Sequence, residues 1–162
     1  MNRLVKQSSL RPFDWDSETY CGDGLEALCE VLINASPIDK RLNIIDYQVW
    51  NVKEHGADMG IDGCGVGFDG LTHCVQIKFR TNTQNDLTAN HDHISNFVAM
   101  SETFAGADRH MTLITTAKGL RQTTNDEMYG GKVRTLGYEQ LSKLVDENTA
   151  FWQLFLDEMK KV

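Results

Sequence analysis

The spacing of apolar residues predicts one amphipathic helix early in the chain. Its apolar positions follow an i, i+3, i+4, i+7, i+8 pattern and are Leu25, Leu28, Cys29, Leu32 and Ile33. A helix with this pattern buries one face and exposes the other. Asp23 and Glu26 stand three residues apart at the expected start, as in a capping box. We therefore expect a helix that begins at Asp23 and ends before Pro37.

Segments rich in β-forming residues follow this helix. Residues 42–52 and 72–80 contain many β-branched and aromatic side chains, which predicts a strand in each. A glycine-dense segment, residues 56–70, lies between them. Its last part is expected to pair with residues 72–80 as a β-hairpin that turns at Phe68-Asp69-Gly70. Residues 91–105 carry apolar side chains at helical spacing and predict a second helix.

The remaining third of the chain predicts two more strands and two more helices. Strands are expected at 111–116 and 133–136, an irregular segment at 118–132, and closing helices at 138–145 and 149–160. The order αβββαβ, followed by additions, predicts an α/β fold. We expect a central mixed sheet with the first helix on one face and the second helix on the other.

Length and composition are those of one globular domain. The chain has 162 residues, of which 41% are hydrophobic and 24% charged. These values exclude a disordered or fibrous chain. We expect a single domain over 1–162, with a core at about 22–145 and a C-terminal helix at about 149–160.

The length of the hairpin loop decides whether three polar residues share one face of the sheet. Gln76 and Lys78 are two residues apart and face the same way. A three-residue loop with Gly70 in the left-handed conformation pairs Asp62 with Gln76, and all three side chains then share a face. A two-residue turn pairs Asp62 with Ile77 instead, on the other face unless a glycine bulge intervenes.

A carboxylate, an amide and an ammonium group on one face suit the hydrolysis of a phosphodiester. This reaction needs a divalent cation that neutralises charge and generates hydroxide, and oxygen ligands suit Mg²⁺. A nearby lysine can orient the water and stabilise the transition state. Taken singly, Asp62 also fits a turn residue, Gln76 a solvated strand residue and Lys78 an edge-strand charge.

The segments Gly60-Ile61-Asp62-Gly63 and Val75 to Arg80 (VQIKFR) resemble the PD-(D/E)XK nuclease superfamily. The match is to the QxK variant typical of Mrr-like restriction endonucleases and of nuclease domains attached to some helicases. Three further segments resemble the same family in the same order: Glu26 with Leu32-Ile33, Ile114-Thr115-Thr116, and Leu136-Gly137-Tyr138. The resemblance implies a restriction-endonuclease-like fold and a metal-dependent DNA endonuclease.

The resemblance also implies a role for each residue of the site. Asp62 would be the principal metal ligand, and Gln76 would take the place of the usual second acidic ligand. The carbonyl group of Ile77 would complete the metal site, and Lys78 would be the catalytic lysine. Glu26 would hold the metal directly or through water. The cofactor would be Mg²⁺, with Mn²⁺ as a substitute.

A neutral Gln76 departs from the two-carboxylate form of this site. It removes one negative charge, which weakens cation binding unless Glu26 or Asp58 compensates. Glu26 also fits a plain capping residue. A second interpretation therefore stays open, in which the domain is a catalytically inactive module that binds DNA or protein.

The net charge alone argues against a nucleic-acid partner. The chain carries 16 basic and 23 acidic residues, for a net charge of −7. The excess of acid lies mostly before Lys78, and residues 78–134 are close to neutral. Arg80, Lys118 and Arg121 are the expected DNA contacts. We expect weak, salt-sensitive DNA binding, with targeting supplied by a homodimer or by a larger helicase or translocase.

Other features predict little additional chemistry. The N-terminal segment has no apolar signal region, and no apolar run is long enough to span a membrane, so a cytoplasmic protein of bacterial, phage or viral origin is expected. The spacings between the four cysteines do not match zinc ligands. His91-Asp92-His93 is interpreted as a helix start, with metal binding as the alternative. Trp15, Trp50 and Trp152 are expected to be packing residues.

Overall fold

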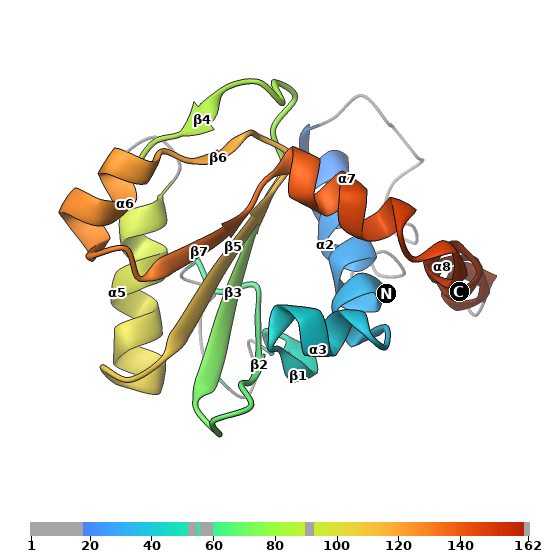
Figure 1. Ribbon diagram of the computed structural model, residues 1–162, viewed down its shortest axis with the longest axis horizontal. Coiled ribbons are helices and arrows are strands. Elements are labelled where there is room, and N and C mark those ends of the chain that lie inside the picture. Colours follow the sequence, from blue (N-terminus) through green and yellow to red (C-terminus); the bar gives the residue numbers. More distant parts are fainter. Residues whose placement is uncertain (1–17, 52–54, 56–59, 90–92, 161–162) are drawn as a thin grey trace.

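A five-stranded mixed sheet forms the centre of the molecule (Figure 1). The computed structural model describes residues 18–51, 55, 60–89 and 93–160. The strand order is β1-β2-β3-β5-β7, with antiparallel pairing among the first three strands and parallel pairing among the last three. The strands are β1 (Ile45–Val49), β2 (Gly63–Val66), β3 (Thr72–Lys78), β5 (His110–Thr115) and β7 (Val133–Leu136). The predicted α/β class with a mixed sheet is confirmed.

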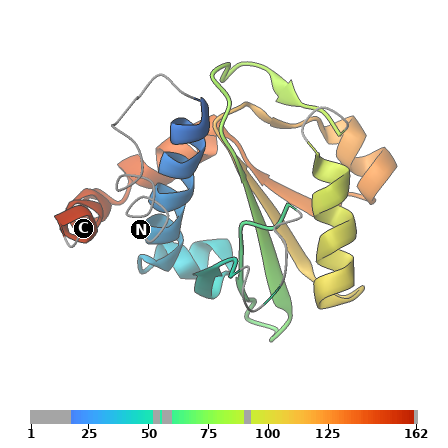
Figure 2. The ribbon, with the colours of Figure 1, turned by 180° about the vertical axis from the view of Figure 1, so that it is seen from behind.

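Helices cover both faces of this sheet. One face carries α2 (Glu18–Asn34), α3 (Ile38–Leu42), α7 (Tyr138–Asp146) and α8 (Thr149–Lys160). The other face carries α5 (Ile94–Ala105) and α6 (Gln122–Tyr129), and both views show the two groups on opposite sides (Figures 1 and 2). The sheet therefore separates two apolar cores. No helix in the described part of the chain is long and apolar enough to span a membrane.

Side chains of β3 alternate between these two cores. Val75 and Ile77 pack with Leu25, Cys29 and Leu32 of α2. Cys74 packs in the other core with Phe97 of α5. Because alternate residues of a strand face opposite sides, Gln76 and Lys78 project toward the α5 face. This alternation positions the candidate site.

The β2–β3 hairpin has the loop predicted from the sequence. Gly63 pairs with Val75 and Val66 with Thr72. The Gly67 amide donates to the Leu71 carbonyl over 2.9 Å, and Gly70 has a left-handed φ of 81°. The ladder ends with Gly63 opposite Val75, and beyond it the Asp62 amide also donates to the Val75 carbonyl, over 2.9 Å. The three-residue loop predicted from the sequence is therefore confirmed.

Several predicted boundaries are wrong. Helix α2 begins at Glu18, so Asp23 lies inside the helix and is not its N-cap. Gly22 and Gly24 lower helix propensity by about 1 kcal/mol each, but burial of the apolar face against β3 outweighs that cost. The first strand covers only Ile45–Val49, and the short helix α3 precedes it. The second helix begins at Ile94.

The segment 118–132, predicted to be irregular, contains β6 (Gly119–Leu120) and helix α6. β6 pairs in parallel with β4 (Asp86–Leu87) as a separate two-stranded sheet. Helix α6 has no apolar periodicity, and Asn125 anchors it. The side-chain Nδ2 of Asn125 donates to the Val133 carbonyl over 2.8 Å, and its Oδ1 accepts from the Val133 backbone amide over 3.2 Å. A contact between distant residues of this kind leaves no periodic pattern in the sequence, so the helix could not be predicted from spacing.

Two tryptophans are described, and they differ in exposure. Trp50 is buried in the α5-side core and contacts the rings of His55 and Phe104. Trp152 lies half-exposed on α8, so the prediction of a packing residue is confirmed only for Trp50. Trp15 lies outside the described residues.

Gly137 is expected to be intolerant of a side chain. A Cβ atom there would overlap the carbonyl oxygen of Lys118, where the start of α7 passes the chain leading into β6. Gly137→Ala should therefore lower the free energy of unfolding by about 2 kcal/mol, measured by urea denaturation. Gly24→Ala is the matched control, because nothing lies within 4 Å of its Cβ position. Equal stability of Gly137→Ala and the parent would contradict this packing.

Candidate active site

Asp62 is a buried carboxylate fixed between two strands. Its backbone amide donates to the Val75 carbonyl, and its carbonyl accepts from the Trp50 amide, each over 2.9 Å. Its side chain is also bound, because Oδ2 accepts from the backbone amide of Ile77 over 2.6 Å. The residue is only 9% exposed. The carboxylate is thus held against β3 at the position between Gln76 and Lys78.

Gln76 contributes a buried amide with an unused acceptor. The residue is 1% exposed, and its Oε1 has no hydrogen-bond partner within the described structure. A Cβ at Gly60 would lie 3.2 Å from Gln76 Nε2, and Gly60 has a φ of 102°, so glycine suits this approach. A buried acceptor left unpaired costs about 1–3 kcal/mol. Gln76 Oε1 is therefore suited to a donor or a cation.

Lys78 ends β3 on the same face as Gln76. Its carbonyl accepts from the Thr115 hydroxyl over 2.7 Å and from the Thr116 amide over 3.2 Å, which clamps its backbone to β5. Its side chain is partly exposed. Among the described residues, the ammonium group makes no hydrogen bond or ion pair. It is therefore available to a ligand.

Glu26 reaches the same region from α2. Burial raises the pKa of the Cys29 thiol, and the charges of Glu26 and Asp62 raise it further. Burial also raises the pKa of Tyr47 well above its usual value, and the same two carboxylates are among the additional causes. Glu26 and Asp62 thus act on the same two buried groups. Glu26 belongs to the α2 face, however, whereas Gln76 projects toward the α5 face.

Tyr47 was not predicted from the sequence. It is 4% exposed, and its hydroxyl has no hydrogen-bond partner in the described structure. A Cβ at Gly63 would overlap this hydroxyl, so the glycine next to Asp62 makes room for the ring. Only the pairing of β1 with β2 brings Tyr47 beside Gly63. No spacing in the sequence marks that contact.

The predicted DNA contacts gather around the small β4–β6 sheet. This sheet lies at the end of the main sheet where β3 and β5 finish (Figure 1). Arg80 lines a pocket of about 280 Å³ there, together with Asp86. The Lys118 amide donates to the Asn85 carbonyl over 3.0 Å, and its side chain is exposed. Arg121 forms an ion pair with Asp86 at 3.7 Å, which reduces its availability to a phosphate.

The described residues fit a water-rich Mg²⁺ site better than an all-protein cage. No group of three or more His, Cys, Asp or Glu side chains among them could hold a metal ion. Mg²⁺, however, needs only one or two carboxylates and keeps several waters. Asp62 can supply one such ligand, and a second can come from Glu26 on the α2 side or from the unpaired oxygen of Gln76 on the α5 side. Asp58, His91 and Asp92 lie outside the described residues.

Comparison with known proteins gives a structural similarity without a family. No family model and no curated protein matches the chain. The crystal structure of protein VC1899 from Vibrio cholerae is similar over 85% of this chain and 34% of that chain, with a TM-score of 0.48 and 12% sequence identity. The match therefore spans about a third of that protein's length.

Proposed function

We propose that the chain is a metal-dependent deoxyribonuclease of the restriction-endonuclease-like, PD-(D/E)XK type. The observation that supports this best is the bond from the Ile77 amide to Asp62 Oδ2. It fixes a carboxylate beside the strand residues that carry a buried amide oxygen and an unpaired ammonium. A carboxylate anchored in this way is suited to binding a cation at the surface of β3.

Each residue has a distinct task in this proposal. Asp62 would hold Mg²⁺ together with either Glu26 from the α2 side or Gln76 from the α5 side, and the ion would neutralise charge and acidify a bound water. Lys78 orients the attacked phosphate through its ammonium group and stabilises the negative charge that develops on it. Arg80 and Lys118 contact neighbouring phosphates of the backbone. Two cuts in a duplex require two such sites, so the active form is a homodimer or part of a larger helicase-containing protein inside the cell.

The test of this function is cleavage of plasmid, single-stranded and branched DNA with Mg²⁺, Mn²⁺ or EDTA. We expect cleavage with either metal and none with EDTA. Absence of cleavage with both metals favours the second candidate, an inactive module that binds DNA or protein, whereas cleavage in EDTA would contradict the metal dependence. The neutral Gln76 supports that alternative, and retained DNA binding without any metal signal in a titration would establish it.

Glu26→Gln is expected to weaken Mg²⁺ binding about tenfold, because it removes one of two carboxylates from a site already short of one charge. Isothermal titration with MgCl₂ measures this change. Glu30→Gln is the matched control, since Glu30 lies one turn further along the same helix. If the two variants and the parent titrate alike, Glu26 has no role at the metal.

A further inference from the structure

A second polar site lies at the opposite end of the sheet, where the parallel strands begin. His73 is at the start of β3, His110 and Thr112 are in β5, and Arg134 is in β7. The register sets His73 beside His110 and Thr112 beside Arg134. Side chains that alternate in phase along neighbouring strands share a face. These four therefore project from the α2 face, as do Val75 and Ile77 further along β3.

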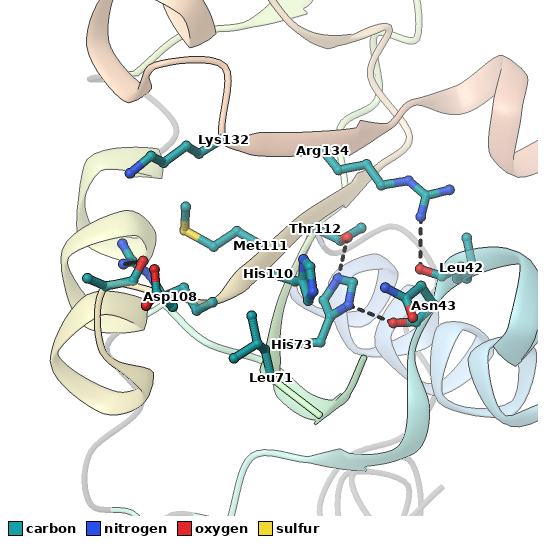
Figure 3. Close-up of a pocket in the computed structure, with 12 residues that line it drawn as sticks. Leu42, Asn43, Leu71, His73, Asp108, His110, Met111, Thr112, Lys132 and Arg134 are labelled. Atoms are coloured by element: carbon teal, nitrogen blue, oxygen red, sulfur yellow. Dashed lines mark hydrogen bonds between the residues drawn. The ribbon is translucent and has the colours of Figure 1, made fainter. Parts of the chain in front are cut away.

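A pocket of about 530 Å³ opens over these residues (Figure 3). Its size falls within the range of sites for small organic ligands. Leu42 and Asn43 close one side at the end of α3, and Ala107 to Arg109 close the other. In Figure 3, Lys132 and Arg134 extend from the β7 segment toward opposite sides of the pocket, with His110 and His73 between them.

The floor of the pocket is rigid and uncharged. The backbone carbonyl of Asn43 accepts from His73 Nδ1 over 2.8 Å, so the ring proton lies on Nδ1. Nε2 is then the acceptor, and the Thr112 hydroxyl donates to it over 2.7 Å. Burial lowers the pKa of His73 to about 4, so the ring is neutral at pH 7. Both nitrogens are occupied, and His73 serves as a fixed support.

The walls of the pocket carry an excess of positive charge. The exposed side chain of Lys132 makes no hydrogen bond or ion pair with the described residues, and only its backbone amide is bonded, to the Tyr129 carbonyl over 3.1 Å. Arg134 donates to the Leu42 carbonyl over 2.8 Å and makes only a long 3.5 Å contact to the Arg41 carbonyl. The residue is exposed. His110 Nε2 donates a hydrogen bond to Asp69 Oδ2 over 2.8 Å, and Asp108 is the one acidic residue among those that line the pocket.

We propose that this pocket binds a small ligand that carries a phosphate group, with Lys132 on one side of the pocket and Arg134 on the other as cationic partners. Arg and Lys side chains bind phosphate by charge-assisted hydrogen bonds. The chain has a net charge of −7, so the positive charge around this pocket is opposite in sign to that of the whole chain. The volume leaves room for an organic group beside the phosphate, and Leu71, which is partly exposed, supplies an apolar surface for it. The proposal is independent of nuclease activity, since Asp62 and Lys78 lie at the other end of β3.

Isothermal titration with AMP, inorganic phosphate and adenosine tests this site. We expect AMP and phosphate to bind and adenosine to bind at least about tenfold more weakly than AMP, because it lacks the phosphate. Equal binding of AMP and adenosine, or no binding of AMP and phosphate, would overturn the proposal. Displacement of AMP by a duplex oligonucleotide without terminal phosphates would also overturn it, because the surface would then belong to a DNA interface.

Lys132→Ala locates the binding to the pocket. This exposed side chain makes no contact that holds the fold, so the variant should fold normally and bind AMP about tenfold more weakly. Lys143→Ala, an equal loss of charge on the exposed face of α7, should leave AMP binding unchanged. A similar loss in both variants would show a general charge effect, and no loss in Lys132→Ala would place AMP elsewhere. Either result contradicts the proposed site.

Discussion

Asp62→Asn is expected to abolish Mg²⁺-dependent DNA cleavage while the fold stays intact. Asparagine keeps an oxygen that can accept from the Ile77 amide, so the main-chain anchor at 2.6 Å survives. It removes the negative charge that binds the cation. Loss of metal-assisted stabilisation should lower the cleavage rate about a thousandfold or more, equivalent to about 4 kcal/mol. Plasmid nicking at saturating DNA and Mg²⁺ measures the rate.

Two companion variants separate chemistry from stability. Asp62→Ala removes both the charge and the acceptor, and the unpaired Ile77 amide should cost a further 1–3 kcal/mol or so in unfolding free energy. Asp46→Asn is the charge control, because Asp46 is exposed on the neighbouring β1 and its left-handed φ of 53° tolerates asparagine. Full cleavage by Asp62→Asn would refute a metal-ligand role for Asp62.

Lys78→Met should lower the cleavage rate by about a hundredfold to ten-thousandfold, without loss of metal binding. Methionine retains much of the length of the side chain and removes only the ammonium. Because that ammonium makes no hydrogen bond or ion pair with the described residues, unfolding free energy should change by less than about 0.5 kcal/mol. Single-turnover cleavage, alongside a Mg²⁺ titration, measures both properties.

Lys118→Met gives the contrasting result. Its side chain is exposed, and the proposal assigns it to the DNA backbone. We expect weaker DNA binding and a smaller salt dependence, with an unchanged rate at saturating DNA. If Lys78→Met behaves like Lys118→Met, Lys78 is a binding residue and not a catalytic one.

The sequence predicted the parts of the site that depend on local geometry. The hairpin register followed from Gly70 and from the two-residue alternation of β3, and both are properties of neighbouring residues. The apolar stripe of α2 also identified a helix that packs on β3, although not where that helix begins. Local signals were therefore sufficient to set the β2–β3 register and to bring Asp62 beside β3.

Contacts between distant segments could not be predicted in this way. Helix α6 depends on two hydrogen bonds between Asn125 and Val133, and its own residues have no amphipathic pattern. Tyr47 is next to Gly63 only because β1 pairs with β2. The cationic pocket combines strands β3, β5 and β7 with the end of α3. Each feature arises from chain topology, and none from residue spacing.

The Ile77 amide has an experimental use of its own. It donates to a carboxylate, whereas a strand amide ordinarily donates to a backbone carbonyl. Its chemical shift and exchange rate in nuclear magnetic resonance will therefore follow the charge on Asp62. Protonation of Asp62, or withdrawal of its electron density by a bound cation, should be visible at this one resonance. The amide thus reports directly on the residue on which the proposed chemistry depends.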